Sequence, residues 1–335
     1  MLKKFLKSRE LTSIVFILAL FLGVGVVNPA FLSGRNVMLC FNGSVVYTIM
    51  AMGIAFVIMT GEIDVSVGAT MGMAAAVSAT MIRDGAPWTL AVGAALLIGV
   101  AVGLINGFGV TVIGIPSIIM TLGINGIVRG LIYVYTGGKW VENLPYAFKA
   151  LSQASLGQAT YFYLAALLAM VAIHLLLTQT RRGRYIAAVG DNAGGATLLG
   201  IPVTGTKIAS FVLCGAAASV GGILYASRVG FVTPTAGSGY EMKVIAACVL
   251  GGISLSGGVG SVIGASVGAA IMASISRVLV FLGFSSDYDD TITGILLITI
   301  VVCDALLQHR AAVKARRVRL AAKTANTGAK GAAAH

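Results

Sequence analysis

The sequence predicts an all-α, polytopic membrane protein. Only 10% of its 335 residues are charged and 58% are hydrophobic, giving a mean hydropathy of +0.96. Soluble domains carry about a quarter charged residues. The apolar residues form long runs, and a helix crosses the hydrocarbon core with roughly 20 of them. Because these runs are continuous rather than alternating, they indicate a helix bundle and not a β-barrel.

The first apolar run follows the basic start "MLKKFLKSRE", an order that resembles a secretory signal peptide. No clear cleavage site of small residues follows it, so we expect an uncleaved first crossing. Eight further runs have the length and apolarity of crossings. The nine predicted spans are 11–27, 37–60, 63–82, 87–113, 116–136, 161–178, 208–226, 259–282 and 291–308.

A tenth crossing is expected near 243–256, although this stretch is short and interrupted by glycine. Most of the 23 Lys and Arg residues lie in the N-terminus, in the segment 181–207 and after residue 308. Basic segments of membrane proteins stay in the cytoplasm. Placing all three there requires an even number of crossings, so the sequence predicts about ten, with both termini cytoplasmic. Residues 1–308 would form one transmembrane domain, and 309–335 a basic, disordered tail.

Several of the 44 glycines are spaced four apart within predicted spans, which places them on one helix face. Such faces allow close helix packing, within the bundle or at a dimer seam. A weak internal similarity also relates 61–68 to 251–258, with too few identities to establish a duplication. The spaced glycines are Gly68/Gly72, Gly103/Gly107, Gly126/Gly130 and Gly260/Gly264/Gly268.

Charged residues at membrane depth are costly and are therefore candidates for function. Glu62 and Asp64 fall at the break between the second and third spans. They are expected either to line the inner mouth of a path or, for Asp64, to cap the third helix. Arg129 and Arg277 lie in the outer parts of their spans, where we expect them to extend to the membrane interface.

Two uncharged polar residues, Asn106 and Asn125, lie deep in predicted spans. Each is a candidate for hydrogen bonding a polar cargo along a substrate path, or for joining two helices. No catalytic motif, P-loop or metal-ligand spacing occurs, so neither an enzyme nor a cofactor or metal site is predicted. The basic charge is explained by membrane orientation and does not predict nucleic-acid binding. A transport role is the remaining expectation.

The segment 181–207, "RRGRYIAAVGDNAGGATLLGIPVTGTK", is the longest polar stretch between spans. Asp191 or Asn192 is suited to begin a short helix that Gly200 ends. A short helix flanked by arginines fits a groove on a partner protein. Contact with anionic membrane lipid is the alternative.

The stretch "GRYIAAVGDNAGGATLLGI" resembles the cytoplasmic coupling segment of permeases in the branched-chain amino-acid/monosaccharide (ribose-type) group of bacterial ABC importers. The stretches 61–79, 115–138 and 249–269 resemble the same group, in the same order. The resemblance implies an inner-membrane permease subunit whose coupling segment contacts a separate ATP-binding subunit. By position, the contact residues would be Arg184, Tyr185, Gly190, Asn192, Ala196 and Gly200.

The resemblance further implies a second, related permease subunit and a periplasmic substrate-binding protein. Within the group, "TGGKWVENLP" (136–145) and "GYEMKVIAACVLGGISLSGG" (239–258) are most similar to permeases for autoinducer-2, a furanosyl signal. Ribose or another monosaccharide is the alternative cargo. A stand-alone ion-coupled transporter is disfavoured because no series of mid-span carboxylates is evident.

Overall fold

The computed structural model describes residues 9–299 and 301–302, and this part of the chain is almost entirely helical. Its strands are the two-residue β1 (Ser155–Leu156) and β2 (Ala159–Thr160), which pair as a small antiparallel hairpin. Short 3-10 and π turns occupy Pro29–Leu32, Gly109–Ile113 and Ser286–Tyr288. Residues 289–299 and 301–302 are also helical. The named helices are α2 (Arg9–Val27), α3 (Gly34–Gly43), α4 (Val45–Met59), α5 (Val67–Arg83), α6 (Trp88–Phe108), α7 (Ser117–Thr136), α8 (Tyr146–Gln153), α9 (Tyr161–Gln179), α10 (Arg181–Asp191), α11 (Ala193–Leu198), α12 (Val203–Val229), α13 (Tyr240–Leu250) and α14 (Val262–Phe281).

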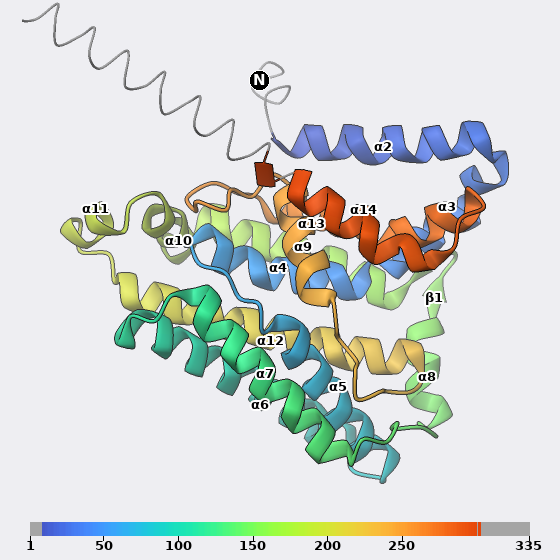
Figure 1. The fold of residues 1–335 in the computed structure, drawn as a ribbon, viewed down its shortest axis with the longest axis horizontal. Helices are drawn as coiled ribbons and strands as arrows, with labels where there is room; N and C mark the ends of the chain where they lie inside the picture. Colours follow the sequence, from blue (N-terminus) through green and yellow to red (C-terminus); the bar gives the residue numbers. More distant parts are fainter. Residues whose placement is uncertain (1–8, 300, 303–335) are drawn as a thin grey trace, which may run out of the picture.

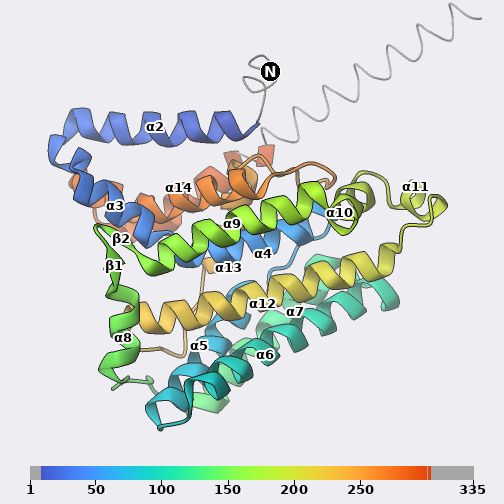
Figure 2. The same ribbon diagram turned by 180° about the vertical axis from the view of Figure 1, so that it is seen from behind.

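The long helices lie side by side as a bundle with two distinct ends (Figures 1 and 2). One end carries α10 and α11, and the other carries α3, α8 and the hairpin. Helix α12 lies in the interior, where it contacts α4, α5 and α6, and α14 contacts α13, α4 and α2. This arrangement confirms the predicted polytopic helical fold.

Glycines bring the central helices into close contact, as predicted for three of the four spaced sets. Gly103 and Gly107 of α6 lie against the backbone of α12 at Phe211 and Ile208. Gly68 and Gly72 pack against residues 236–237, and Gly264 and Gly268 against α13. In contrast, nothing lies within 4 Å of the position that a Cβ would take at Gly126 or Gly130 of α7.

Five of the described helices are long and apolar enough to cross a membrane: α6 with its π turn, α7, α9, α12 and α14. The pair α3 and α4, which is bent by 43° at Ser44, makes a sixth. Ten crossings therefore remain a prediction. The last predicted span is helical through residue 302, and its remainder lies outside the described residues, as does the tail 309–335.

The prediction of a crossing helix over 243–256 was wrong in its extent. Helix α13 covers only Tyr240–Leu250, and at 1.5 Å per residue it spans about half of the hydrocarbon core. Turns form most of residues 231–239 before it, and 251–261 after it are not helical. Likewise, the third predicted span becomes helical only at Val67, because 61–66 form an irregular connection. Two elements of the bundle are thus broken rather than continuous.

Candidate functional site: a projecting helical segment and the polar groups behind it

The segment that follows α9 forms two helices, α10 and α11, where the sequence predicted a single short one. Thr180 caps α10, because its Oγ1 accepts a hydrogen bond from the Gly183 N–H at 3.0 Å. Asn192 caps α11 in the same way, accepting from the Gly195 N–H at 2.9 Å. Gly200 ends α11 with a φ of +75°, a conformation that glycine adopts without strain. The predicted cap and stop are confirmed. Residues 181–191 form an additional helix, α10, that the sequence did not predict.

The tip of this segment exposes large apolar side chains. Leu198 and Leu199 are 90% and 81% exposed. Helix α11 projects from one end of the bundle (Figures 1 and 2). Arg184, Asn192 and Gly200 are also exposed, whereas Tyr185 is half-buried. Exposed leucines are suited to a partner protein, because a protein groove removes their apolar surface from water.

Gly190 and Ala196, the other two predicted contact residues, face this chain itself. Ala196 is buried. Gly190 lies directly against the Met59 carbonyl at the end of α4 and against the Gly258 N–H. That N–H donates to the Met59 carbonyl at 3.0 Å. The predicted role of Gly190 and Ala196 in partner contact stays a prediction.

A charged pair makes a second connection between the projecting segment and the bundle. Lys207, at the start of α12, forms an ion pair with Glu62, and both side chains are less than one-fifth exposed. We refer to Met59, Glu62, Gly190, Lys207 and Gly258 as the coupling junction. It joins the projecting segment to both breaks of the bundle, after α4 and after α13. These are the two stretches whose sequences are weakly similar, and they lie against each other.

Asp64 and Asn106 belong to one buried hydrogen-bond network behind the junction. Asp64 Oδ1 accepts from the Ser66 N–H at 2.8 Å and from the Ser66 hydroxyl at 2.6 Å. Asn106 Nδ2 donates to that hydroxyl at 2.8 Å and so ties α6 to the start of α5. Both residues are almost fully buried. These contacts correspond to the capping and helix-joining hypotheses, although Asn106 Oδ1 has no hydrogen-bond partner among the described residues.

Arg129 makes its contacts inside the bundle, and its extension to the membrane interface stays a prediction. Its Nη1 donates to the Ala236 carbonyl at 2.6 Å, and its Nη2 lies 3.7 Å from Glu241 Oε2. The two side chains are only 20% and 13% exposed. Helix α7 packs against α5. The Ala236 carbonyl and the Glu241 carboxylate hold the guanidinium of Arg129 inside the bundle.

Arg129, Glu241 and Asn125 form a polar cluster with open hydrogen-bonding capacity. Asn125 lies one helical turn before Arg129 on α7. Asn125 Oδ1, Arg129 Nη2 and Glu241 Oε2 are each buried without a hydrogen-bond partner in the described part of the chain. Unpaired buried polar atoms are rare, and they are typical of sites that take water or a polar ligand. The sequence did not point to Glu241, because this residue lies just before the crossing predicted at 243–256. Its ion-pair partner, Arg129, is distant in the sequence.

These features are those of a polytopic helical membrane protein with polar groups buried between its helices. Comparison with known proteins specifies the class: residues 37–301 match the family described as "Branched-chain amino acid transport system / permease component". The chain belongs to this family, and it is a multi-pass permease of the bacterial inner membrane.

Several similar proteins are permeases of an autoinducer 2 import system. The chain is 40% identical over 321 residues to the autoinducer 2 import system permease protein LsrC of Enterobacter sp. (strain 638), covering 94% of each chain. The proteins of the same name from Salmonella typhi and Escherichia coli O157:H7 are 40% and 37% identical, over 92% and 96% of this chain and 89% and 94% of theirs. No solved structure matches the chain.

Proposed function

We propose that the chain is the transmembrane permease subunit of an ATP-driven importer for autoinducer-2. A separate ATP-binding subunit hydrolyses ATP, a second related permease completes the membrane path, and a periplasmic substrate-binding protein delivers the cargo. The carrying observation is the projecting α10–α11 segment, which is joined to two breaks of the bundle. The names of relatives that share 37–40% of residues along nearly the whole chain support the cargo.

The mechanism is alternating access driven from the cytoplasmic end. ATP binding closes the ATP-binding subunit, which holds the projecting segment through Arg184 of α10 and through Leu198 and Leu199 at the end of α11. The displacement passes through the coupling junction to the irregular connections after α4 and α13. These connections are not helical, so the adjoining helices tilt about them without breaking intrahelical hydrogen bonds. A polar path then opens toward the cytoplasm, with Asn125 and Asn106 as candidates for cargo contact.

The first test replaces an exposed contact residue at the tip of the segment. We expect Leu198→Asp to abolish copurification of the ATP-binding subunit and to lower uptake at least about tenfold, because a carboxylate must be desolvated in an apolar groove. The thermal midpoint of the chain is expected to stay unchanged, since the side chain is 90% exposed. Leu156→Asp, on the hairpin at the opposite end and 69% exposed, is the matched control.

A charge reversal tests the same contact independently. Arg184→Glu is expected to reduce both uptake and cargo-stimulated ATP hydrolysis in vesicles, with Arg35→Glu, an exposed arginine of α3, as the control. Normal uptake and hydrolysis in both Leu198→Asp and Arg184→Glu would remove the coupling role from this segment.

Competition uptake decides the cargo. In vesicles holding the complete importer, excess unlabelled autoinducer-2 is expected to suppress uptake of the labelled signal, while ribose leaves it unaffected. Suppression by ribose at equal concentration would instead assign the monosaccharide alternative.

A further inference from the structure

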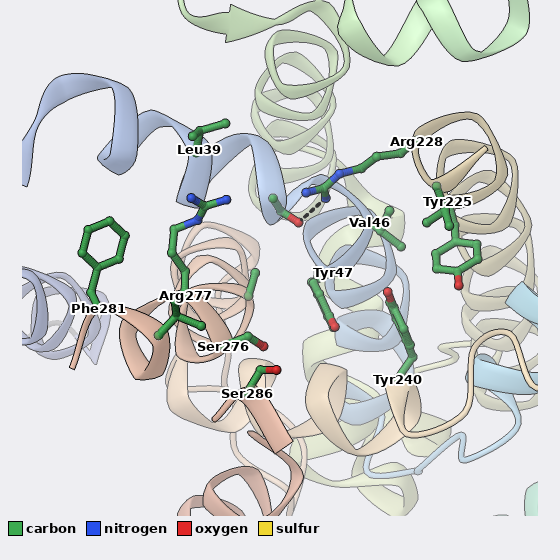
Figure 3. Close-up of a pocket in the computed structure, with 14 residues that line it drawn as sticks. Leu39, Val46, Tyr47, Tyr225, Arg228, Tyr240, Ser276, Arg277, Phe281 and Ser286 are labelled. Atoms are coloured by element: carbon green, nitrogen blue, oxygen red, sulfur yellow. Dashed lines mark hydrogen bonds between the residues drawn. The ribbon is translucent and has the colours of Figure 1, made fainter. Parts of the chain in front are cut away.

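A large cavity lies at the end of the bundle opposite α10 and α11, between α3, α12 and α14 (Figure 3). Its volume is about 590 Å³, and of its fourteen lining residues two are basic and none is acidic. A neighbouring cavity of about 220 Å³ shares Leu39, Val46, Arg228 and Arg277 with it. The two arginines thus lie where both cavities meet.

The two guanidinium groups share this space without a counter-charge. Arg277 extends from α14 and Arg228 from α12, toward the end of α3 (Figure 3). Guanidinium groups stay protonated in proteins, so two positive charges line the same cavity. Among the described residues, no carboxylate forms an ion pair with either arginine. Two like charges in a low-dielectric setting are costly unless an anion joins them.

Much of the hydrogen-bonding capacity of these arginines is also free. Arg228 Nη1 donates to the Gly43 carbonyl at 2.7 Å, which satisfies the last turn of α3. Arg277 makes no hydrogen bond within the described part of the chain, although it is half-buried. Its donors therefore remain available to a ligand.

The acidic residues beside the cavity are already engaged elsewhere. Asp289 accepts from Lys243 Nζ at 2.8 Å and from the Ser276 hydroxyl, and Asp290 lies 3.1 Å from the same ammonium. Lys243 thus pairs with both carboxylates, and neither of them forms an ion pair with Arg228 or Arg277 in the described part of the chain.

We propose that this cavity binds an oxyanion of the phosphate class, held between Arg277 and Arg228 and carried by a phospholipid headgroup. Planar guanidinium groups donate paired hydrogen bonds to phosphate oxygens. The volume matches ligand sites of 300–1,000 Å³ and exceeds what a phosphate ion alone fills. Leu39 and Val280 line the cavity and are 37% and 60% exposed, so the glycerol and acyl chains leave along apolar side chains.

The experiment measures lipid binding to the purified, delipidated full-length chain by native mass spectrometry. Phosphatidylglycerol is expected to bind the unmodified chain, and Arg277→Gln to weaken this binding about tenfold through the loss of charge-assisted hydrogen bonds. Arg277→Lys keeps the charge but loses the paired donors, so an intermediate affinity is expected. Arg35→Gln, an exposed arginine of α3 outside the cavity, is expected to bind like the unmodified chain.

Glycerol 3-phosphate separates the lipid from a soluble ester with the same chemistry. Failure of a millimolar excess to displace the bound lipid supports the headgroup assignment, and displacement overturns it. Equal phosphatidylglycerol binding by the unmodified chain and Arg277→Gln would overturn the site itself. If Arg277→Gln does not fold, equal binding by Arg277→Lys and Arg228→Lys has the same consequence.

Discussion

At the scale of single residues, the coupling junction depends on the absence of a Cβ at Gly190. A Cβ at this position would overlap the Met59 carbonyl and the Gly258 N–H, which are backbone atoms and cannot rotate away. Gly194, four residues further along, has only the side chain of Asn192 within van der Waals distance, at 3.5 Å. The two glycines differ in burial and contact although both lie in the same polar segment.

We therefore expect Gly190→Ala to destabilise the chain by about 1–3 kcal/mol, the usual cost of forcing extra volume into a packed site. At growth temperature we expect the variant to stay folded while its uptake falls, because the proposed mechanism passes motion through the junction. Thermal unfolding in detergent and uptake in vesicles measure the two effects. Gly194→Ala is the matched control, and equal behaviour of the two variants would argue against the junction.

At the scale of helices, α7 differs from every other glycine-rich helix of the bundle that the structure describes. Gly123, Gly126 and Gly130 lie on one exposed face with nothing within 4 Å, and Ile119 and Ile127 beside them are 64% and 59% exposed. The glycine faces of α6 and α14 are instead filled by α12 and α13. Because small residues permit close backbone approach in membranes, we expect α7 to contact the second permease that the proposed function requires.

Gly126→Leu is expected to prevent copurification of the second permease while leaving the chain itself folded, since no neighbour within the chain is displaced. Gly23→Leu of α2, which also has nothing within 4 Å, supplies the control. A complex that assembles normally with leucine at position 126 would move the interface away from α7.

At the scale of the whole molecule, the first and last described helical residues lie close together. The start of α2 lies beside the helical end at 301–302 in both views (Figures 1 and 2). We expect the basic segment 181–207 to lie on the cytoplasmic side, and an even number of crossings would place both ends of the chain there too.

Impermeant labelling tests this orientation directly. In intact cells, a maleimide that cannot cross the membrane is expected to label Ser155→Cys in the hairpin and to spare Thr197→Cys in α11. The unmodified chain provides the background, and its described cysteines, Cys40, Cys214 and Cys248, are buried. Labelling of Thr197→Cys from outside would invert the proposed topology.

Continuous apolar runs were enough to predict the helical class and most of the long helices, because burial in lipid demands an unbroken apolar helix. Local signals were also reliable: the Asn192 side chain caps α11, and Gly200 ends it with a positive φ that glycine adopts without strain. Non-local pairing was not predictable. Arg129 meets Glu241 across more than a hundred residues, and Lys207 meets Glu62 likewise, so neither partner is visible in its own surroundings. The roles of the candidate site residues stay predictions.

The contact between Gly190, Met59 and Gly258 has a mechanical consequence. It consists of peptide groups in direct touch, so no rotatable side-chain torsion lies between the segment that is moved and the helices that respond. A linkage through long side chains would bend and absorb part of each displacement. A contact between backbone atoms is expected to be stiffer. In the proposed mechanism, little of the displacement of α10 and α11 is therefore lost before it reaches the ends of α4 and α13.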